Sequence, residues 1–265
     1  MVGPRTASAA TKGVFMTRQE MIECQAFMES IGLGMQGYGC NIMTGAVMTI
    51  QLAFLSLALA LILGLMTASA KLSRSKTARG IAMTYTTVIR GVPDLVLMLL
   101  IFYGGQIGLN NLLYVIGSRI GQPNLFVEIH QFTAGVVTIG FIFGAYMGES
   151  FRGAFLAVPK GQIEAGQAYG MNRSQVFTRI LLPQMVRHAL PSLGNNWMVL
   201  LKTTALVSII GLQDMVLIAS RASRQLNEPF AFFLPVAIIY LLLTAVSEIG
   251  IKALNKRFSR GVISS

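Results

Sequence analysis

Residues 42–70 read IMTGAVMTIQLAFLSLALALILGLMTASA and contain no charged side chain. About 20 consecutive apolar residues are enough for a helix to cross the hydrocarbon core of a bilayer. The whole chain has the same character, because 54% of its residues are hydrophobic and only 12% are charged. Soluble domains carry about 25% charged residues and could not build a surface from this composition. The sequence therefore predicts an all-α integral membrane protein.

Apolar segments of similar length predict four further transmembrane helices, at residues 81–103, 132–157, 192–219 and 229–251. The resulting five-helix model divides the chain into an outer N-terminal extension, a transmembrane domain and a tail, at residues 1–41, 42–252 and 253–265. For the extension the sequence leaves two expectations, an interfacial helix near residues 18–31 or simple disorder. The mixed charge of the extension argues against a cleavable signal peptide, and no internal repeat of useful length is visible.

The distribution of basic residues predicts the orientation of these helices. Twelve basic residues fall in three segments on one side of the five-helix model: Lys71, Arg74, Lys76, Arg79, Lys160, Arg173, Arg179, Arg187, Lys252, Lys256, Arg257 and Arg260. The opposite side carries six: Arg5, Lys12, Arg18, Arg119, Arg221 and Arg224. Because cytoplasmic loops are enriched in Lys and Arg, we expect the N-terminus outside and the C-terminus in the cytoplasm.

A proline interrupts the second predicted span at Arg90-Gly91-Val92-Pro93-Asp94. Pro93 removes a backbone donor and disfavours helix at Val92, so we expect a broken or kinked helix. Broken helices at membrane depth occur where the backbone lines a cavity or packs within protein. Asp94 is then a candidate to face a passage, whereas Arg90 has the alternative of snorkelling toward the cytoplasmic headgroups.

The third predicted span carries Glu149 and Arg152, which are three residues apart and share a helix face. Ionisable groups inside a membrane are costly unless paired or hydrated, and they mark candidate functional sites. The pair has two interpretations, a structural ion pair near the cytoplasmic interface or part of a substrate pathway.

A polar segment at residues 162–183 separates the third and fourth predicted spans. Its first part, Gln162 to Tyr169, predicts a short helix ended by Gly170 in a left-handed cap. Asn172 with Gln175 three residues later predicts the start of a second helix, and Pro183 is expected to mark its end. Two short helices joined at a glycine form a stiff projection from the membrane, although an ordinary amphipathic connector is the alternative.

Other chemistries find little support in the sequence. Cys24 and Cys40 both lie in the outer segment, so a disulfide is open but not required. His130 and His188 stand alone without metal-ligand spacing, and no metal site is expected. No G-x-x-x-x-G-K-[ST] sequence is present, so ATP and Mg²⁺ would have to be bound by another chain. The net charge is +11, but the basic residues flank membrane spans and no aromatic platform for stacking bases accompanies them, which disfavours nucleic-acid binding.

Several motifs together resemble the permease subunits of polar amino acid importers of the ATP-binding-cassette type. The segment from Gln162 to Gly170, followed by Ile180-Leu181-Leu182-Pro183, is similar to the EAA loop of that family. The remaining matches are RGVPDLV at 90–96, ESFRGAF at 149–155, VPKGQIEA at 158–165, GNNW at 194–197 and LVSIIGLQD at 206–214. Together they cover about residues 42–260 and most resemble the permease of the histidine and lysine/arginine/ornithine importer and the related opine permeases.

This resemblance implies a type I importer subunit in a bacterial inner membrane. It implies two ATPase subunits, a second permease subunit and a periplasmic binding protein as partners, besides membrane lipid. A cytoplasmic coupling loop at about residues 158–190 is implied to contact the ATPase, through Glu164, Ala165, Gly166, Gly170, Ile180, Leu182 and Pro183. The long N-terminal segment departs from the short outer tail that is usual in the family.

The expected function is ATP-driven import of polar, cationic amino acids by alternating access. Arg90, Asp94, Glu149 and Arg152 are the candidate pathway residues, and the two acids are suited to offset a cationic passenger in a low-dielectric cavity. The same acids have the alternative of balancing Arg90 and Arg152. An opine importer, an ion channel or receptor-like protein and an intramembrane enzyme are the other functional classes, but a channel would leave the EAA-like loop unexplained and an enzyme would need a nucleophile and base within the spans.

Overall fold

The computed structural model describes residues 18–30, 37–119 and 126–258, which are almost entirely helical. The remaining parts of the predicted extension and tail lie outside the described residues. The elements in chain order are α1 (Arg18–Ser30), α2 (Gly39–Leu72), α3 (Lys76–Gly91), α4 (Asp94–Leu99), η3 (Leu100–Gly104), α5 (Gly105–Arg119), α6 (Gln131–Ala157), α7 (Lys160–Ala168), α8 (Arg173–Val176), η4 (Phe177–Leu181), α9 (Leu182–Thr203), η5 (Thr204–Ile210), α10 (Met215–Leu226) and α11 (Pro229–Phe258).

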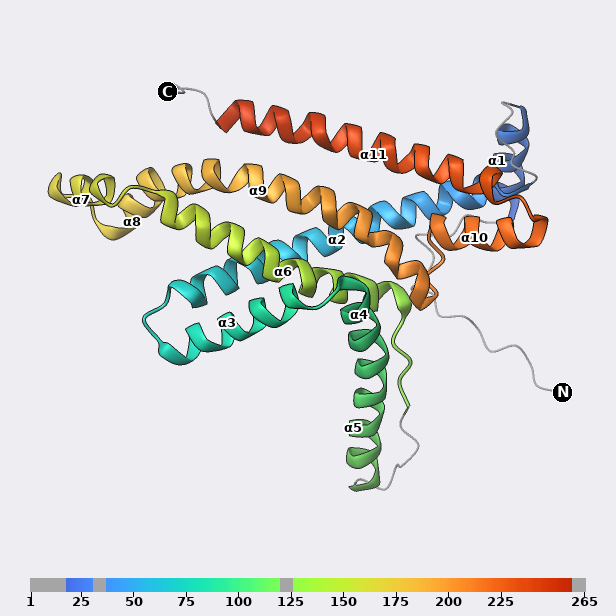
Figure 1. The fold of residues 1–265 in the computed structure, drawn as a ribbon, viewed down its shortest axis with the longest axis horizontal. Coiled ribbons are helices and arrows are strands. Elements are labelled where there is room, and N and C mark those ends of the chain that lie inside the picture. Colours follow the sequence, from blue (N-terminus) through green and yellow to red (C-terminus); the bar gives the residue numbers. More distant parts are fainter. Residues whose placement is uncertain (1–17, 31–36, 120–125, 259–265) are drawn as a thin grey trace.

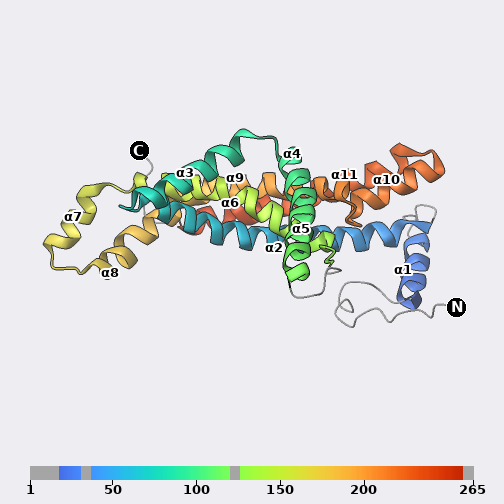
Figure 2. The same ribbon diagram turned by 90° about the horizontal axis from the view of Figure 1, so that it is seen from below.

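Four long helices, α2, α6, α9 and α11, run along the length of the molecule (Figure 1). The short helices α7 and α8 lie at one end, together with the C-terminal end of α11, and α1 and α10 lie at the other (Figures 1 and 2). Helix α3 packs beside α2 and α6, α4 contacts α6 and η5, and α5 projects away from the bundle (Figure 1). Helix α1, in the described part of the predicted extension, and the α7–α8 segment thus lie at opposite ends.

Glycines on α6 allow it to pack closely against α2. A Cβ atom placed at Gly140 or Gly144 would lie within 3 Å of Leu59 or Leu63 side-chain atoms, and one at Gly148 would lie 2.9 Å from Thr67 Cβ. These glycines recur every four residues and so share one face of α6. Small residues with this spacing let transmembrane helices approach each other, where van der Waals packing replaces the hydrophobic effect. The central pair of the bundle is α2 with α6.

Five helices are long and apolar enough to cross a membrane, within the described residues. The first, third and fifth agree with the predicted spans, and they are Gly39–Leu72, Gln131–Ala157 and Pro229–Phe258. The predicted boundaries of the second span, residues 81–103, are wrong, because the membrane-length helix is Asp94–Arg119. The predicted break is confirmed: α3 ends at Gly91, and Val92 and Pro93 are extended before α4 starts. The break therefore separates two helices and does not lie inside one span.

The fourth span is also shifted from its prediction of residues 192–219. One continuous helical run covers Arg173–Ile210, so the expectation that Pro183 ends a helix is wrong. Pro183 lies in the first turn of α9, directly after the π-helical segment η4. Pro183 has no N–H to donate to the preceding turn, and the wider π turn before it, which closes with i→i+5 hydrogen bonds, accommodates the proline within the helical run. The helix therefore passes through the proline.

Asp214 lies beyond the fourth spanning helix, not inside it as predicted. It caps α10, where its Oδ1 atom accepts a hydrogen bond from the backbone N–H of Leu217 at 2.9 Å. The chain turns at Gly211, whose φ of 92° is in the left-handed region. Asp214 is fully buried, and its Oδ2 atom has no hydrogen-bond partner in the described part of the chain. Burial raises the pKa of this carboxyl to about 6.

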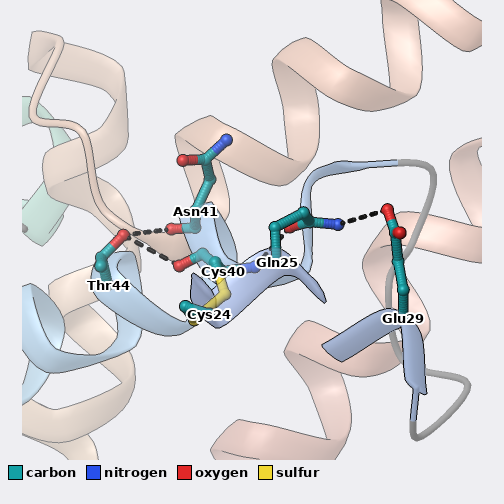
Figure 3. Close-up of a disulfide and its surroundings, with 6 residues drawn as sticks. All are labelled: Cys24, Gln25, Glu29, Cys40, Asn41 and Thr44. Atoms are coloured by element: carbon teal, nitrogen blue, oxygen red, sulfur yellow. Dashed lines mark hydrogen bonds between the residues drawn. A yellow bond between two sulfur atoms is a disulfide. The ribbon is translucent and has the colours of Figure 1, made fainter. Parts of the chain in front are cut away.

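A disulfide joins α1 to the first turn of α2 (Figure 3). The Cα atoms of Cys24 and Cys40 are 6.0 Å apart, within the usual range for such a bond. Gln25 strengthens the junction because its Oε1 atom accepts a hydrogen bond from the Cys40 backbone N–H at 3.4 Å. Met28 is buried, while Ile22 on the other side of α1 is exposed. The disulfide that the sequence left open is therefore present, on the helix predicted near residues 18–31.

Candidate functional site

Three charged side chains from two helices form an ion-pair network near the end of the bundle that carries α7. Glu149 of α6 binds Lys71 of α2 through one oxygen and the Nε atom of Arg152 through the other, at 2.9 Å for the second pair. Lys71 also donates a hydrogen bond to the Thr86 hydroxyl on α3. The Lys71 side chain is 9% exposed and that of Glu149 is 18% exposed. The predicted pair of Glu149 with Arg152 is thus part of a larger network that links α2, α3 and α6.

A cavity of about 700 Å³ adjoins this network. Its lining comes from the end of α2, one face of α3 and the facing residues of α6: Lys71, Arg79, Met83, Thr86, Thr87, Arg90, Gly91, Tyr146, Glu149 and Arg152. Four cationic side chains and one carboxylate line it, so its formal charge is +3. Ligand cavities of a few hundred cubic ångströms with a few convergent polar groups are typical binding sites.

Arg90 and Asp94 lie on either side of the helix break. The Arg90 guanidinium carbon is 5.5 Å from the centroid of the Tyr146 ring, a cation–π arrangement. Asp94 also lies near enough for its charge to act on Tyr146. Within the described residues, no ion pair joins Arg90 to Asp94. Asp94 is half-buried and is not among the residues that line the cavity.

A smaller cavity of about 330 Å³ shares Arg90, Tyr146 and Glu149 with the first and extends between α6 and α9. Uncharged polar groups dominate its far wall. The Ser150 and Ser192 hydroxyls are 2.6 Å apart, and Asn196 Nδ2 donates to Ser150 Oγ at 2.9 Å. The two cavities together place a cationic region beside a hydroxyl and amide region.

The polar segment between α6 and α9 begins with the short helix α7, as predicted, whereas the second predicted helix is not a separate short one, because α8 is the start of the continuous helical run Arg173–Ile210. Gly170 has a φ of 80° and ends α7 in a left-handed turn. Asn172 and Gln175 form a capping box at the start of α8, with both hydrogen bonds at 2.9 Å. Gly166 is buried, and a Cβ atom there would lie 2.5 Å from Ile180 Cδ1, so close packing of the two helices requires a small residue. The capping box at the start of α8 and the close contact of Gly166 with Ile180 hold the two parts of the projection against each other, so we expect the projection to be stiff.

The predicted loop residues divide into an exposed and a packed set. Glu164, Ala165, Gly170 and Pro183 are exposed, whereas Gly166, Ile180 and Leu182 are buried or half-buried. Tyr169 at the tip is 89% exposed. A large aromatic side chain at the end of a rigid projection is a candidate contact for another protein, because aromatic residues are enriched at interfaces.

The structure brings together three of the four predicted pathway residues, Arg90, Glu149 and Arg152. The sequence does not reveal that Lys71, Tyr146 and the polar face of α3 line the cavity. In the sequence Lys71 is only a basic residue flanking the first span, because no local pattern pairs it with Glu149. A periodic signal was available for α3, because Arg79, Met83, Thr86 and Arg90 recur at helical spacing. Within the described residues, no group of three or more His, Cys, Asp or Glu side chains is placed to hold a metal ion.

Comparison with known proteins identifies the family. A family model described as a binding-protein-dependent transport system inner membrane component matches residues 60–260. The histidine/lysine/arginine/ornithine transport system permease protein HisQ of Escherichia coli (strain K12) is 50% identical over 226 residues, which cover 85% of this chain and 96% of that protein. The octopine transport system permease protein OccQ of Rhizobium meliloti is 37% identical over 236 residues, covering 89% and 98% of the two chains.

Solved structures agree with the sequence matches. A crystal structure of an amino acid ABC transporter with histidines superposes with a TM-score of 0.71 at 31% identity, covering 85% of this chain and 97% of that chain. An inward-facing form of the MetNI methionine ABC transporter shares the fold at 15% identity, with a TM-score of 0.57. Five membrane-length helices, a rigid polar projection and these matches over most of the chain lead to one conclusion: the chain belongs to the family of inner membrane components of binding-protein-dependent transport systems.

Proposed function

We propose that this chain is the permease subunit of an ATP-driven importer whose passengers are cationic amino acids of the histidine, arginine, lysine and ornithine class. The observation that carries the proposal is the 50% identity to HisQ across 96% of that protein. The polar cavity between α3 and α6 supports it, because a passage for a charged amino acid needs hydrated polar walls at membrane depth.

Energy for import would come from partner ATPase subunits, which bind ATP and Mg²⁺. The coupling loop at about residues 158–190 is the proposed docking element, with Glu164, Ala165 and Gly170 on the side that faces the ATPase. The capping box at Asn172 and the close contact of Gly166 with Ile180 support this role, because a rigid loop transmits displacement without absorbing it. A second permease subunit and a periplasmic binding protein complete the proposed assembly.

The proposed orientation places α1 and the disulfide outside and the α7–α8 projection in the cytoplasm. Two independent observations support it: the twelve-to-six distribution of basic residues, and the disulfide between Cys24 and Cys40. Disulfides persist in oxidising compartments such as the periplasm and are rare in the cytoplasm. Single cysteines introduced at Ser75 and Gln19, after removal of the native pair, test the orientation. An impermeant thiol reagent added to intact cells should label the cysteine at position 19 and spare the one at position 75, and the reverse pattern would contradict the model.

Uptake by the reconstituted complex tests the function. The chain is assembled in liposomes with its ATPase, second permease and binding protein, and uptake of labelled arginine, histidine and octopine is measured with and without internal ATP. We expect ATP-dependent uptake of arginine and histidine. Uptake of octopine alone would instead assign an opine importer, and ion flux without ATP would assign a channel.

Asp94→Asn tests the proposed preference for cationic passengers. The substitution keeps the size and polarity of the side chain but removes its charge, so arginine uptake should fall more than glutamine uptake. Glu248→Gln is the matched control, because Glu248 forms an exposed ion pair with Lys252 on α11. An unchanged ratio of arginine to glutamine uptake, normalised to assembled complex, would remove Asp94 from the pathway.

A further inference from the structure

Helix α3 presents two different faces to its surroundings. Arg79, Thr86 and Arg90 face the cation-rich cavity beside α6. Ala78, Ile81 and Ala82 line an apolar groove of about 510 Å³ on the side of α2. The polar face is the one suited to contact a hydrated passenger, whereas the apolar groove is suited to contact lipid.

The carboxylate of the cavity is already neutralised by its neighbours. One oxygen of Glu149 is bound by Lys71 and the other by Arg152, while Lys71 also donates to Thr86. Positive charge is therefore left over at Arg79 and Arg90. Arg79 donates a hydrogen bond to the Ser73 carbonyl at 3.3 Å, at the end of the cavity near the start of α3.

Arg90 has the less common environment of the two. It lies in the last turn of α3, directly before the helix break, and its side chain is exposed. Its guanidinium lies over the Tyr146 ring, and no acidic side chain of the described residues forms an ion pair with it. The exposed Arg90 guanidinium therefore has no carboxylate partner among the described residues, although it lines a cavity large enough for a small ligand. Stacking on an aromatic ring fixes the guanidinium plane and leaves its N–H donors available.

We propose that Arg90, held on the Tyr146 ring, binds the carboxylate of the transported amino acid. A guanidinium recognises a carboxylate with two parallel hydrogen bonds, and the surplus positive charge of the cavity favours an anionic group at this point. The adjoining cavity between α6 and α9 then accommodates the rest of the amino acid beside Ser150, Ser192 and Asn196. This inference rests on the proposed function, because it assigns a role within the same transport pathway.

Direct binding of histidine and histamine tests the assignment, because histamine is histidine without its carboxylate. The assembled permease–ATPase complex is placed in nanodiscs without the binding protein, so that the selectivity of that partner does not contribute. We expect wild type to prefer histidine, Arg90→Gln to weaken histidine binding by about tenfold to a hundredfold, and histamine binding to stay unchanged. Arg90→Lys, which keeps the charge but not the paired donors, should lie between the two and covers the case in which Arg90→Gln does not assemble.

Lys252→Gln is the control, because Lys252 also carries a positive charge but is exposed on α11 and lines neither cavity. It should leave the ratio of histidine to histamine affinity close to the wild-type ratio. Equal loss for both ligands in Arg90→Gln, or an equal change of the ratio in Lys252→Gln, would overturn the assignment. If the wild-type complex imports histidine but Arg90→Gln and Arg90→Lys keep the wild-type ratio of histidine to histamine affinity, this inference alone is refuted. If the wild-type complex imports no amino acid, the proposed function is refuted.

Discussion

Replacing Glu149 by Gln should destabilise the chain more than replacing its exposed partner Arg152 by Gln. Glu149 binds two cations, of which Lys71 is 9% exposed and Arg152 is 39% exposed. Removing one member of a buried pair costs about 3–5 kcal/mol, because the remaining charge stays buried without compensation. Lys71 keeps its hydrogen bond to Thr86, so we expect a value at the lower end, about 3 kcal/mol.

The ion pair between Glu149 and the more exposed Arg152 should contribute less to the stability of the fold than the pair with Lys71. Arg152 is partly solvated, and an ion pair at such a site contributes about 1 kcal/mol or less. Since 1 kcal/mol shifts the unfolding midpoint of a chain of this size by about 2–4 °C, Glu149→Gln should lower it by about 6–12 °C and Arg152→Gln by about 4 °C or less. The midpoint is measured on the purified complex by fluorescence-detected size-exclusion chromatography after heating.

A double variant separates the effect of an unpaired buried charge from the effect of changed side-chain packing. Replacing Lys71 by Met and Glu149 by Leu removes both buried charges, and such apolar replacements are often neutral or stabilising. The double variant should therefore recover most of the loss caused by Glu149→Gln. A midpoint of Glu149→Gln within about 2 °C of wild type, about 0.5–1 kcal/mol, would refute the proposed energetics, as would equal losses in Glu149→Gln and Arg152→Gln.

Three further changes test other parts of the structure. Gly64→Ala should destabilise the packing of α2 on α6 by about 1–3 kcal/mol, because its Cβ would lie 2.6 Å from Met147 Cβ; Gly153→Ala, with nothing within 4 Å, is the control for thermal stability. Gly170→Val should strain the left-handed turn by about 1–2 kcal/mol and uncouple ATP hydrolysis from uptake, and wild-type coupling in an assembled variant would contradict the role of the loop. Asp214 has a raised pKa of about 6, so ionisation disfavours the fold and stability should fall as pH rises from about 4, its unfolded pKa, to 6. Asp214→Asn keeps the helix cap and should abolish this pH dependence of the unfolding midpoint, measured between pH 4 and 7. A variant with the same pH profile as wild type would show that Asp214 is not the group responsible.

The transmembrane helices were predictable where one segment is uniformly apolar and uninterrupted. Residues 42–70 have no charge, and the helix there ends only two or three residues beyond the prediction on either side. The second span was misplaced because the apolar run after Pro93 contains Gly104, Gly105 and several amides, which lowered its apparent hydrophobicity. A helix can nevertheless continue through such residues, and here it does so by way of the π-helical segment η3.

The candidate site was only partly predictable, for a related reason. The pair of Glu149 and Arg152 follows from helical spacing, because the two residues are three apart on one helix. Lys71 lies 78 residues from Glu149, and only the packing of α2 on α6 brings them together. Spacing along one helix relates residues only one or two turns apart, so it predicts the pair of Glu149 with Arg152 but not the contact with Lys71. Likewise, the spacing of Asn172 and Gln175 correctly predicted the capping box. Pro183 led to a wrong helix end, because the π turn that accommodates it cannot be predicted from local sequence.

The glycine contacts between α2 and α6 also determine how this chain can move. The glycines Gly140, Gly144 and Gly148 bring α6 into contact with the Leu59, Leu63 and Thr67 side chains of α2, and this interlocking opposes sliding of one helix along the other. The projection α7–α8 is joined to α6 at Ala157 and continues into α9 on its other side. In the proposed importer, a push on the projection would therefore reach α2, α6 and α9 together. The helices are interrupted at Val92–Pro93 and at Gly211, and we expect these two joints to be the hinges about which the cavity of that importer opens.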